Sequence, residues 1–190
     1  MKLSKERISN AIWILAIVLI VFTPVGFHAR VMVGKLFAFS ADIIEESEQR
    51  HMITYDWSLV DLNGNAINLE SSKGEVVIIN LWATWCPPCV AEMPSLQKLY
   101  KDYGDKVRFV FVTNEQTEKV SQFLQKKNYQ LPVYSERSKT PDALFSRSIP
   151  ATYIISKSGK IVVDEKGAAN WNSKKTRNLL DELLIEEVTF

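Results

Sequence analysis

The chain has few of the cysteines and histidines that bind structural zinc or build a network of disulfides. Its 190 residues include two cysteines and two histidines, and 23 basic residues nearly balance 22 acidic ones. A structural zinc site needs four ligands, and neither His28 nor His51 is near the cysteines in the sequence, so we expect no metal. A net charge of +1 provides no strong field for a polyanion. Nucleic acid is therefore not an expected partner, and nothing in the sequence calls for a cofactor.

Both cysteines stand in a single motif. W-C-P-P-C at 85–89 follows an apolar run, 76–81, and precedes a helix-like segment, 90–103. Two thiols separated by two residues can close a disulfide across one helical turn, and the positive N-terminal end of a helix stabilises the thiolate of the first. We therefore expect a dithiol/disulfide redox site, with Cys86 as the nucleophile and Cys89 as the resolving thiol.

Two other uses of a cysteine pair fit the sequence less well. A purely structural disulfide over so short a loop would restrain little unfolded-chain entropy, and at an exposed helix start it would be reduced easily. A peroxidase of the peroxiredoxin kind would have a threonine three residues before its reactive cysteine, where this chain has Ala83. A redox-active pair is the preferred interpretation.

An apolar segment near the N-terminus predicts a transmembrane anchor. Residues 8–27 provide about the 20 residues that a helix needs to cross a bilayer. More basic residues precede this segment than follow it closely, so residues 1–7 are expected in the cytoplasm and the bulk of the chain on the extracytoplasmic, periplasmic side. A cleaved signal peptide is the alternative, because the small residues at 38–40 resemble a processing site, although they lie well beyond the apolar segment.

Residues 28–51 are expected to link the anchor to a domain. The run 31–39 is too short to span a membrane and contains Lys35, so it is expected at the membrane interface or as an extension of the helix. From Asp42 to Arg50 the chain is acidic and polar, which indicates a short stalk. Residues 52–190 are then expected to form one domain, long enough to bury its own core.

The order of elements within 52–190 predicts an α/β fold. Asn63-Gly64 lies between two strand-like runs and indicates an N-terminal hairpin. The buried-strand pattern of 76–81 recurs at 108–113 after one helical segment, which predicts a parallel pair. A second hairpin within 152–164 and a closing amphipathic helix around 179–184 complete a mixed central sheet flanked by helices. Further elements are expected at 117–127 (helix), 131–134 (strand) and from Thr140 (short helix).

Two motifs in sequence order make this domain resemble a known family. They are L-W-A-T-W-C-P-P-C-V-A-E-M-P at 81–94 and S-I-P-A-T-Y at 148–153. With them, the chain from about Tyr55 to Leu184 resembles the TlpA/ResA group of membrane-anchored, thioredoxin-like thiol-disulfide oxidoreductases. The resemblance implies a thioredoxin-like fold and an enzyme that exchanges thiols and disulfides through Cys86 and Cys89.

The resemblance also implies roles for residues around the dithiol. The family's proline opposite the dithiol is matched by Pro150, and in relatives its peptide bond is cis. Ile149 would then offer its backbone to an extended substrate segment, as in strand addition. Trp85, Pro87 and Pro88 are the remaining candidate substrate contacts.

A proton acceptor for Cys89 is expected at Glu92. Thioredoxin itself has a buried aspartate six residues before its first cysteine, but this chain has Asn80 there, and an amide cannot accept that proton. Relatives use a glutamate three residues after the second cysteine, which is matched by Glu92. Residues three apart share a helix face, so Glu92 is expected to approach Cys89 and, if desolvated, to have a raised pKa. The alternative is a carboxylate that faces water and is favoured by the helix dipole.

The implied function is the reduction of disulfides in extracytoplasmic client proteins, in some relatives apocytochromes c before haem attachment. Such a reductase needs a membrane dithiol as electron donor, and membrane lipid would contact the anchor. The motif does not fix the direction, since 30 mV corresponds to only about 1.4 kcal/mol for this couple. A disulfide-donating oxidase therefore stays an alternative, and a client-binding or chaperone module without redox turnover is a second.

Overall fold

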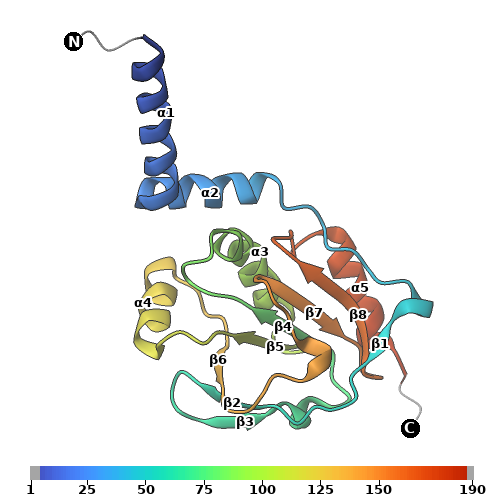
Figure 1. Cartoon of the computed structure of the whole chain (residues 1–190). Coiled ribbons are helices and arrows are strands. Elements are labelled where there is room, and N and C mark those ends of the chain that lie inside the picture. The colour runs from blue at the N-terminus through green and yellow to red at the C-terminus, as the bar shows by residue number, and fades with distance from the viewer. Residues whose placement is uncertain (1–4, 188–190) are drawn as a thin grey trace.

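The structure, a computed structural model, describes residues 5–187, and its centre is a mixed sheet of eight strands (Figure 1). The strand order is β1-β8-β7-β4-β5-β6-β2-β3. β4 is parallel to β5, β5 is parallel to β6, and the other neighbours are antiparallel. The strands are β1 (Arg50–His51), β2 (Ser58–Asp61), β3 (Ala66–Asn68), β4 (Val77–Leu81), β5 (Arg108–Val112), β6 (Val133–Glu136), β7 (Ala151–Ile155) and β8 (Lys160–Lys166).

Five helices accompany this sheet within the described residues. Two of them, α1 and α2, precede the sheet, α3 and α4 connect β4 to β5 and β5 to β6, and α5 follows β8 (Figure 1). The helices are α1 (Lys5–Phe22), α2 (Pro24–Leu36), α3 (Pro87–Tyr103), α4 (Thr117–Lys127) and α5 (Lys174–Ile185), and the 3-10 segments are η1 (Glu46–Glu48), η2 (Leu69–Ser72) and η3 (Asp142–Leu144). The predicted order of strands and helices in the domain is confirmed.

The central strands are buried on both faces, as their continuous apolar runs predict. Successive side chains of a strand point to opposite faces. In β4, Ile78 joins a core cluster with residues of α3, α4 and α5, whereas Val77 and Ile79 join a second cluster with Trp57. Helices α3, α4 and α5 therefore cover one face, and η2, η3 and the chain before β2 cover the other.

Both predicted hairpins are present. In the first, β2 pairs with β3, and the Asp61 carboxylate accepts hydrogen bonds from the amides of Asn63 and Asn65, each at 2.8 Å. Gly64 has a φ of +89°, a conformation that glycine adopts at no steric cost. The second hairpin joins β7 to β8. Strand β7 also pairs with β4, the strand that leads to the cysteine motif.

The apolar N-terminal segment forms two helices where the sequence predicts one. α1 ends at Phe22, and α2 begins at Pro24 at an angle of 75°. The Thr23 hydroxyl caps α2 by accepting from the Gly26 amide at 3.3 Å, and Pro24 occupies the first turn, where no N–H is needed. A Cβ on residue 26 would lie 2.0 Å from the Ile20 carbonyl oxygen, so the bend requires glycine there. The prediction of a single helix over 8–27 is therefore wrong.

No single helix within residues 5–187 is long and apolar enough to cross a membrane, although the bent pair 9–20 and 24–36 meets that test of length and composition when taken together. Residues 1–4 of the predicted cytoplasmic segment lie outside the described part of the chain.

The end of the predicted linker 28–51, including the acidic stalk 42–50, is instead packed onto the domain. Ala41 is buried in the core, the Asn170 amide donates to the Phe39 carbonyl at 2.7 Å, and the Ile44 amide donates to the Val162 carbonyl at 2.9 Å. Strand β1 then pairs with β8 before the expected domain start at Met52. The acidic composition of 42–50 did not indicate this docking, which uses backbone hydrogen bonds, the Ile44 side chain against the second core cluster, and ion pairs such as Arg50–Asp164.

We expect Leu96→Ala to destabilise the fold strongly. Leu96 is fully buried on the inner side of α3, and removing a buried leucine side chain costs about 2–5 kcal/mol because it leaves a cavity. Urea unfolding of the full chain in detergent measures the loss. Ile53→Ala is the control, since Ile53 is 96% exposed and should change stability by less than about 0.5 kcal/mol. Equal losses in the two variants would contradict the assignment of the core.

Candidate active site

The two cysteines lie where the sheet passes the chain to a helix. β4 ends at Leu81, and α3 begins at Pro87 with Cys86 as its N-cap. Cys86 and Cys89 form a disulfide, with their Cα atoms 5.3 Å apart. Cys86 is 3% exposed and Cys89 is fully buried, so an incoming thiol or disulfide meets Cys86 first. The predicted position of the pair at a strand-to-helix junction is confirmed.

The first turn of α3 directs one backbone donor at Cys86. The Cys89 amide lies 3.2 Å from the Cys86 Sγ. Pro87 and Pro88, both half-buried, occupy the first two helical positions and have no N–H to donate. When the disulfide is reduced, the helix end and this single amide favour the thiolate form of Cys86.

The loop before β7 lies directly beside the dithiol. The Ile149–Pro150 peptide bond is cis, as the family resemblance implies. The Ile149 carbonyl oxygen is 3.7 Å from the Cys86 Sγ, within reach of the Cys86 thiol as a donor after reduction. Because Ala151 pairs with Leu81 across the β7–β4 ladder, the sheet fixes this loop opposite the start of α3. The structure therefore brings Ile149 and Pro150 to the cysteines.

A groove of about 430 Å³ runs beside Cys86. Two aromatic side chains on its border are open to solvent, Trp85 at 61% and Phe145 at 60% exposure. Exposed aromatic rings next to a reactive cysteine supply apolar contact area for a bound chain segment. The groove is lined by Leu81, Trp82, Ala83, Trp85, Val112, Thr113, Asn114, Glu115, Glu136, Thr140, Phe145, Ser146 and Ile149.

Glu115 holds the loop that leads to Cys86, a role that the sequence did not reveal. Its carboxylate accepts from the Thr84 amide and, at 2.9 Å, from the Thr84 hydroxyl, and it forms an ion pair with Lys119. Burial alone would raise the pKa of Glu115, but the hydrogen bonds from Lys119 and Thr84 together lower it below its ordinary value. Glu115 is therefore an ionised anchor for the loop.

Glu92 is buried beneath the dithiol, one turn along α3. Its Oε1 accepts from the Asn80 Nδ2 at 2.8 Å, and its Oε2 accepts from the Trp171 Nε1 at 2.8 Å and the Ala169 amide at 3.2 Å. The side chain is 1% exposed, so the alternative of a carboxylate facing water is wrong.

Burial raises the pKa of Glu92 from 4.5 to about 7, although the hydrogen bonds from Trp171, Asn80 and Ala169 oppose the shift. The free-energy cost of desolvating the carboxylate is larger than the stabilisation that the three hydrogen bonds provide. The Oδ1 of Asn80 is buried without a hydrogen-bond partner, while its Nδ2 donates to both Glu92 and Thr152. A role for Glu92 in proton transfer stays a prediction.

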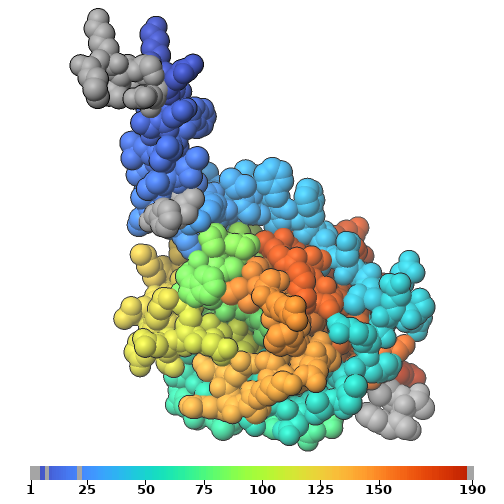
Figure 2. Space-filling view, viewed as in Figure 1, coloured from blue at the N-terminus to red at the C-terminus, as the bar shows by residue number. Residues whose placement is uncertain are grey.

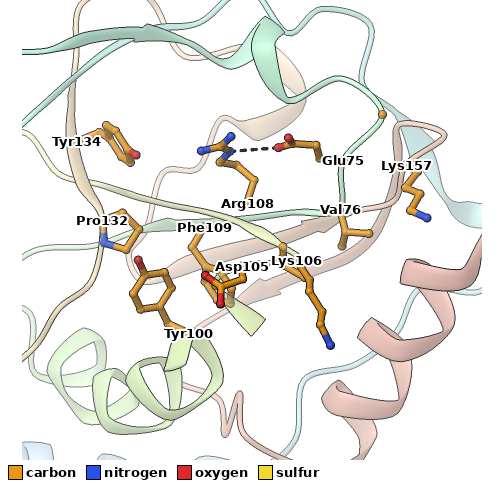
Figure 3. A pocket seen from close by; sticks show the side chains of 13 residues that line it. Glu75, Val76, Tyr100, Asp105, Lys106, Arg108, Phe109, Pro132, Tyr134 and Lys157 are labelled. Atoms are coloured by element: carbon orange, nitrogen blue, oxygen red, sulfur yellow. Dashed lines mark hydrogen bonds and ion pairs between the residues drawn. The ribbon is translucent and has the colours of Figure 1, made fainter. Parts of the chain in front are cut away.

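A second cavity of similar volume lies at the other end of the sheet, near the starts of β4 and β5 (Figure 3). Its lining includes the Glu75–Arg108 ion pair, with 3.1 Å between the carboxylate oxygen and the Arg108 Nε, and the rings of Tyr100 and Tyr134. It contains neither cysteine. Within residues 5–187 no group of three His, Cys, Asp or Glu side chains is placed to hold a metal ion.

We expect the stability of the oxidised protein to depend on the ionisation of Glu92. Because the folded pKa of Glu92 is about 7 and its ordinary value is 4.5, its contribution is complete below about pH 4.5 and is lost as the pH rises through 7. The loss amounts to roughly 3 kcal/mol. Urea unfolding of wild type and Glu92→Gln at several pH values should show that the free energy of unfolding falls more steeply with rising pH in wild type than in the variant. Glu118→Gln, which changes an exposed helix carboxylate, should leave the slope unchanged; parallel curves for wild type and Glu92→Gln would contradict the shift.

Comparison with known proteins agrees with the site. Residues 46–183 match the Redoxin family. Thioredoxin-like protein YneN of Bacillus subtilis is 34% identical over 130 residues, which cover 66% of this chain and 75% of that protein. Thiol-disulfide oxidoreductase ResA of Bacillus thuringiensis is 31% identical over 132 residues, covering 66% of this chain and 71% of ResA.

Solved structures show the same fold. A putative thiol-disulfide oxidoreductase from Bacteroides vulgatus is 30% identical, with a TM-score of 0.54 over 66% of this chain and 90% of that one. A thioredoxin-family thiol:disulfide interchange protein from Chlorobium tepidum is 25% identical, with a TM-score of 0.58 over 71% and 97% of the two chains. With the Cys86–Cys89 pair between a strand and a helix, these matches show that the chain belongs to the Redoxin family, as a thioredoxin-like thiol-disulfide oxidoreductase of the ResA type.

Proposed function

We propose that this oxidoreductase reduces disulfides of client proteins on the extracytoplasmic side of a membrane. The observation that carries the thiol-disulfide exchange is the asymmetry of the pair: Cys86 lies beside the groove that Trp85 and Ile149 line, and Cys89 lies inside, with the buried carboxyl group of Glu92 on the same helix. The direction toward reduction follows the family resemblance. A pKa of about 7 suits a group that takes up and releases protons near neutral pH. One cysteine thus meets the client, and the other completes the reaction in a closed environment.

The reaction runs in two exchanges. The Cys86 thiolate attacks one sulfur of the client disulfide, which forms a mixed disulfide and releases the first client thiolate. The Cys89 thiol then loses its proton to ionised Glu92, and its thiolate attacks the Cys86 sulfur. This step releases the second client thiolate and leaves the Cys86–Cys89 disulfide. Two electrons have passed to the client, and two protons complete its dithiol.

A return to the dithiol state requires a donor of two electrons and two protons. We assign this role to a membrane dithiol protein, because the N-terminal helices supply the means of membrane attachment. Consecutive exposed apolar residues cover all sides of α1, as expected of a helix surrounded by lipid. Residues 8–22 of α1 extend about 23 Å, less than the hydrocarbon thickness of about 30 Å, so the attachment is assigned to the bent pair of α1 and α2, which together meet the length and composition of a span. Residues 1–7 would then face the cytoplasm.

The groove fits an extended client segment. Trp85 and Ile149 line the groove, and the Ile149 carbonyl lies 3.7 Å from the Cys86 Sγ, so the backbone of Ile149 can pair with the segment that carries the reacting cysteine. Pro87, Pro88 and Pro150, which are not among the lining residues of the groove, are proposed as further contacts of that segment. Apocytochromes c are the client class that the family resemblance implies. The oxidase alternative uses the same atoms in reverse, with an electron acceptor in place of the donor.

We expect Cys89→Ser to accumulate mixed disulfides with clients in cells, because Cys86 can attack but nothing resolves the product. Non-reducing gels of the tagged full chain should show bands that disappear on reduction. Cys86→Ser is the matched control and should trap none. A client-binding module without turnover would keep its phenotype when Cys86 is replaced, and trapping by neither variant would contradict the proposed function.

A further inference from the structure

Helix α2 has two apolar sides, and the domain covers only one of them. Phe27 and Val31 lie on the inner side, where Val31 packs with Val90 and Ala91 of α3. A Cβ on residue 34 would come within 3.0 Å of the Ala91 Cβ, so the two helices approach closely at this glycine. The opposite side is exposed by between 53% and 78% at its apolar residues. This outer surface of α2 consists of Val25, Met32, Val33 and Leu36, with Phe37 and Phe39 directly after the helix.

The outer surface is bordered by basic side chains. By the 3.6-residue turn, Arg30 lies on one flank of it and Lys35 on the other, and both are exposed. The sequence of α2 contains no acidic residue. An apolar face with basic borders is the pattern of a helix that lies in the headgroup region of a bilayer with anionic lipids.

The bend between α1 and α2 allows the outer surface of α2 to lie parallel to the membrane plane. α1 rises away from the domain, and α2 runs across the domain at 75° to it (Figure 1). If α1 enters the bilayer along its normal, α2 lies close to the membrane plane with the domain below it. A helix in this position is buried about 5–10 Å into the headgroup boundary, so the attachment uses both helices of the bent pair rather than α1 alone.

We propose that the outer surface of α2 binds an anionic lipid surface while its inner side binds α3, so that α2 fixes the domain against the membrane. This inference rests on the membrane anchor of the proposed function. It adds an orientation: the covered residues Val90 and Ala91 follow Cys89 directly, so the dithiol end of α3 is the end held nearest the bilayer. In the space-filling view, the atoms of α2 extend directly above the green surface at the start of α3 (Figure 2).

This orientation restricts which partners reach Cys86. A donor dithiol must lie at the level of the lipid headgroups, as in an integral membrane protein whose cysteines are at the bilayer surface. A large soluble donor would meet the membrane before the dithiol. In the donor step, the donor's two thiols become its disulfide, and the Cys86–Cys89 disulfide takes up the two electrons and two protons.

The lipid contact can be measured with a fluorescent probe at single sites. In the full chain with Cys86→Ser and Cys89→Ser, we would introduce Leu36→Cys, label it with nitrobenzoxadiazole, and reconstitute it in vesicles of phosphatidylcholine and phosphatidylglycerol. We expect a blue-shifted emission and several-fold stronger quenching by a spin-labelled lipid near the headgroups than for the same probe at Ile53→Cys. Ile53 is the control because it is apolar and 96% exposed but lies outside the outer surface. Met32→Cys should behave like Leu36→Cys.

The other outcomes are distinguishable. A probe at Ile14→Cys, within α1, should be quenched by a spin label deep in the bilayer; if it is not, the membrane anchor itself is wrong. Quenching at residue 14 with a water-exposed probe at residue 36 would overturn the inference and leave the anchor intact. A shielded probe at residue 36 that lipid does not quench would also overturn it, because a second copy or another protein would then cover α2.

The consequence for electron delivery has its own test. In the chain with both cysteines, Leu36→Glu should weaken lipid contact and slow reduction by a dithiol attached to a lipid headgroup several-fold. Reduction by soluble dithiothreitol should be unchanged, because Leu36 is not part of the site. Ile53→Glu should leave both rates unchanged. Equal rates for Leu36→Glu and wild type with the lipid-linked dithiol would contradict the proposed orientation.

Discussion

The buried carboxyl group of Glu92 joins the three parts of the structure on which the redox site depends. Asn80 binds it from the central strand β4, and Trp171 and Ala169 bind it from the segment before α5, while Glu92 itself belongs to the helix that carries both cysteines. Burying a carboxylate is expensive unless it is hydrogen-bonded, and the pKa of about 7 shows that three donors only partly offset that cost. The same imbalance that weakens the fold at high pH gives the group its capacity to take up a proton.

The rest of the site consists of loops and helix or strand ends near the carboxyl end of β4. The N-cap position of Cys86, the loop before β7 and the Glu115 contact to Thr84 all lie at the carboxyl end of β4. Each of these segments is fixed by the sheet or by a charged hydrogen bond, so Cys86 is presented to the groove by a rigid frame. Cys89, one helical turn further, is shielded by the core that stabilises the helix.

The sequence specified much of this because the relevant signals are local. A cysteine pair between an apolar run and a helical segment, and Asn-Gly between two strand-like runs, each predicted an element that the structure contains. The contacts of Glu92 with Trp171 and of Glu115 with Thr84 join residues that are distant in sequence, so local spacing could not predict them. The bend at Pro24 had a local signal, since threonine followed by proline is a helix start, but the continuous apolar run concealed it. The docking of residues 39–44 uses backbone hydrogen bonds, Ala41 and Ile44, and its hydrogen-bond partners lie more than 100 residues away in the chain, so the spacing of residues within the segment did not indicate it.

Two descriptions of the protein, as a reductase and as an oxidase, share every atom of this site and differ in the free energy of the Cys86–Cys89 disulfide. The most direct test is therefore the reduction potential of that pair, measured by equilibrating the full chain in detergent with thiol buffers and following tryptophan fluorescence. The account predicts a value near or below roughly −220 mV, in the range of thioredoxins and glutaredoxins. A value near roughly −120 mV, as in strongly oxidising disulfide donors, would contradict it.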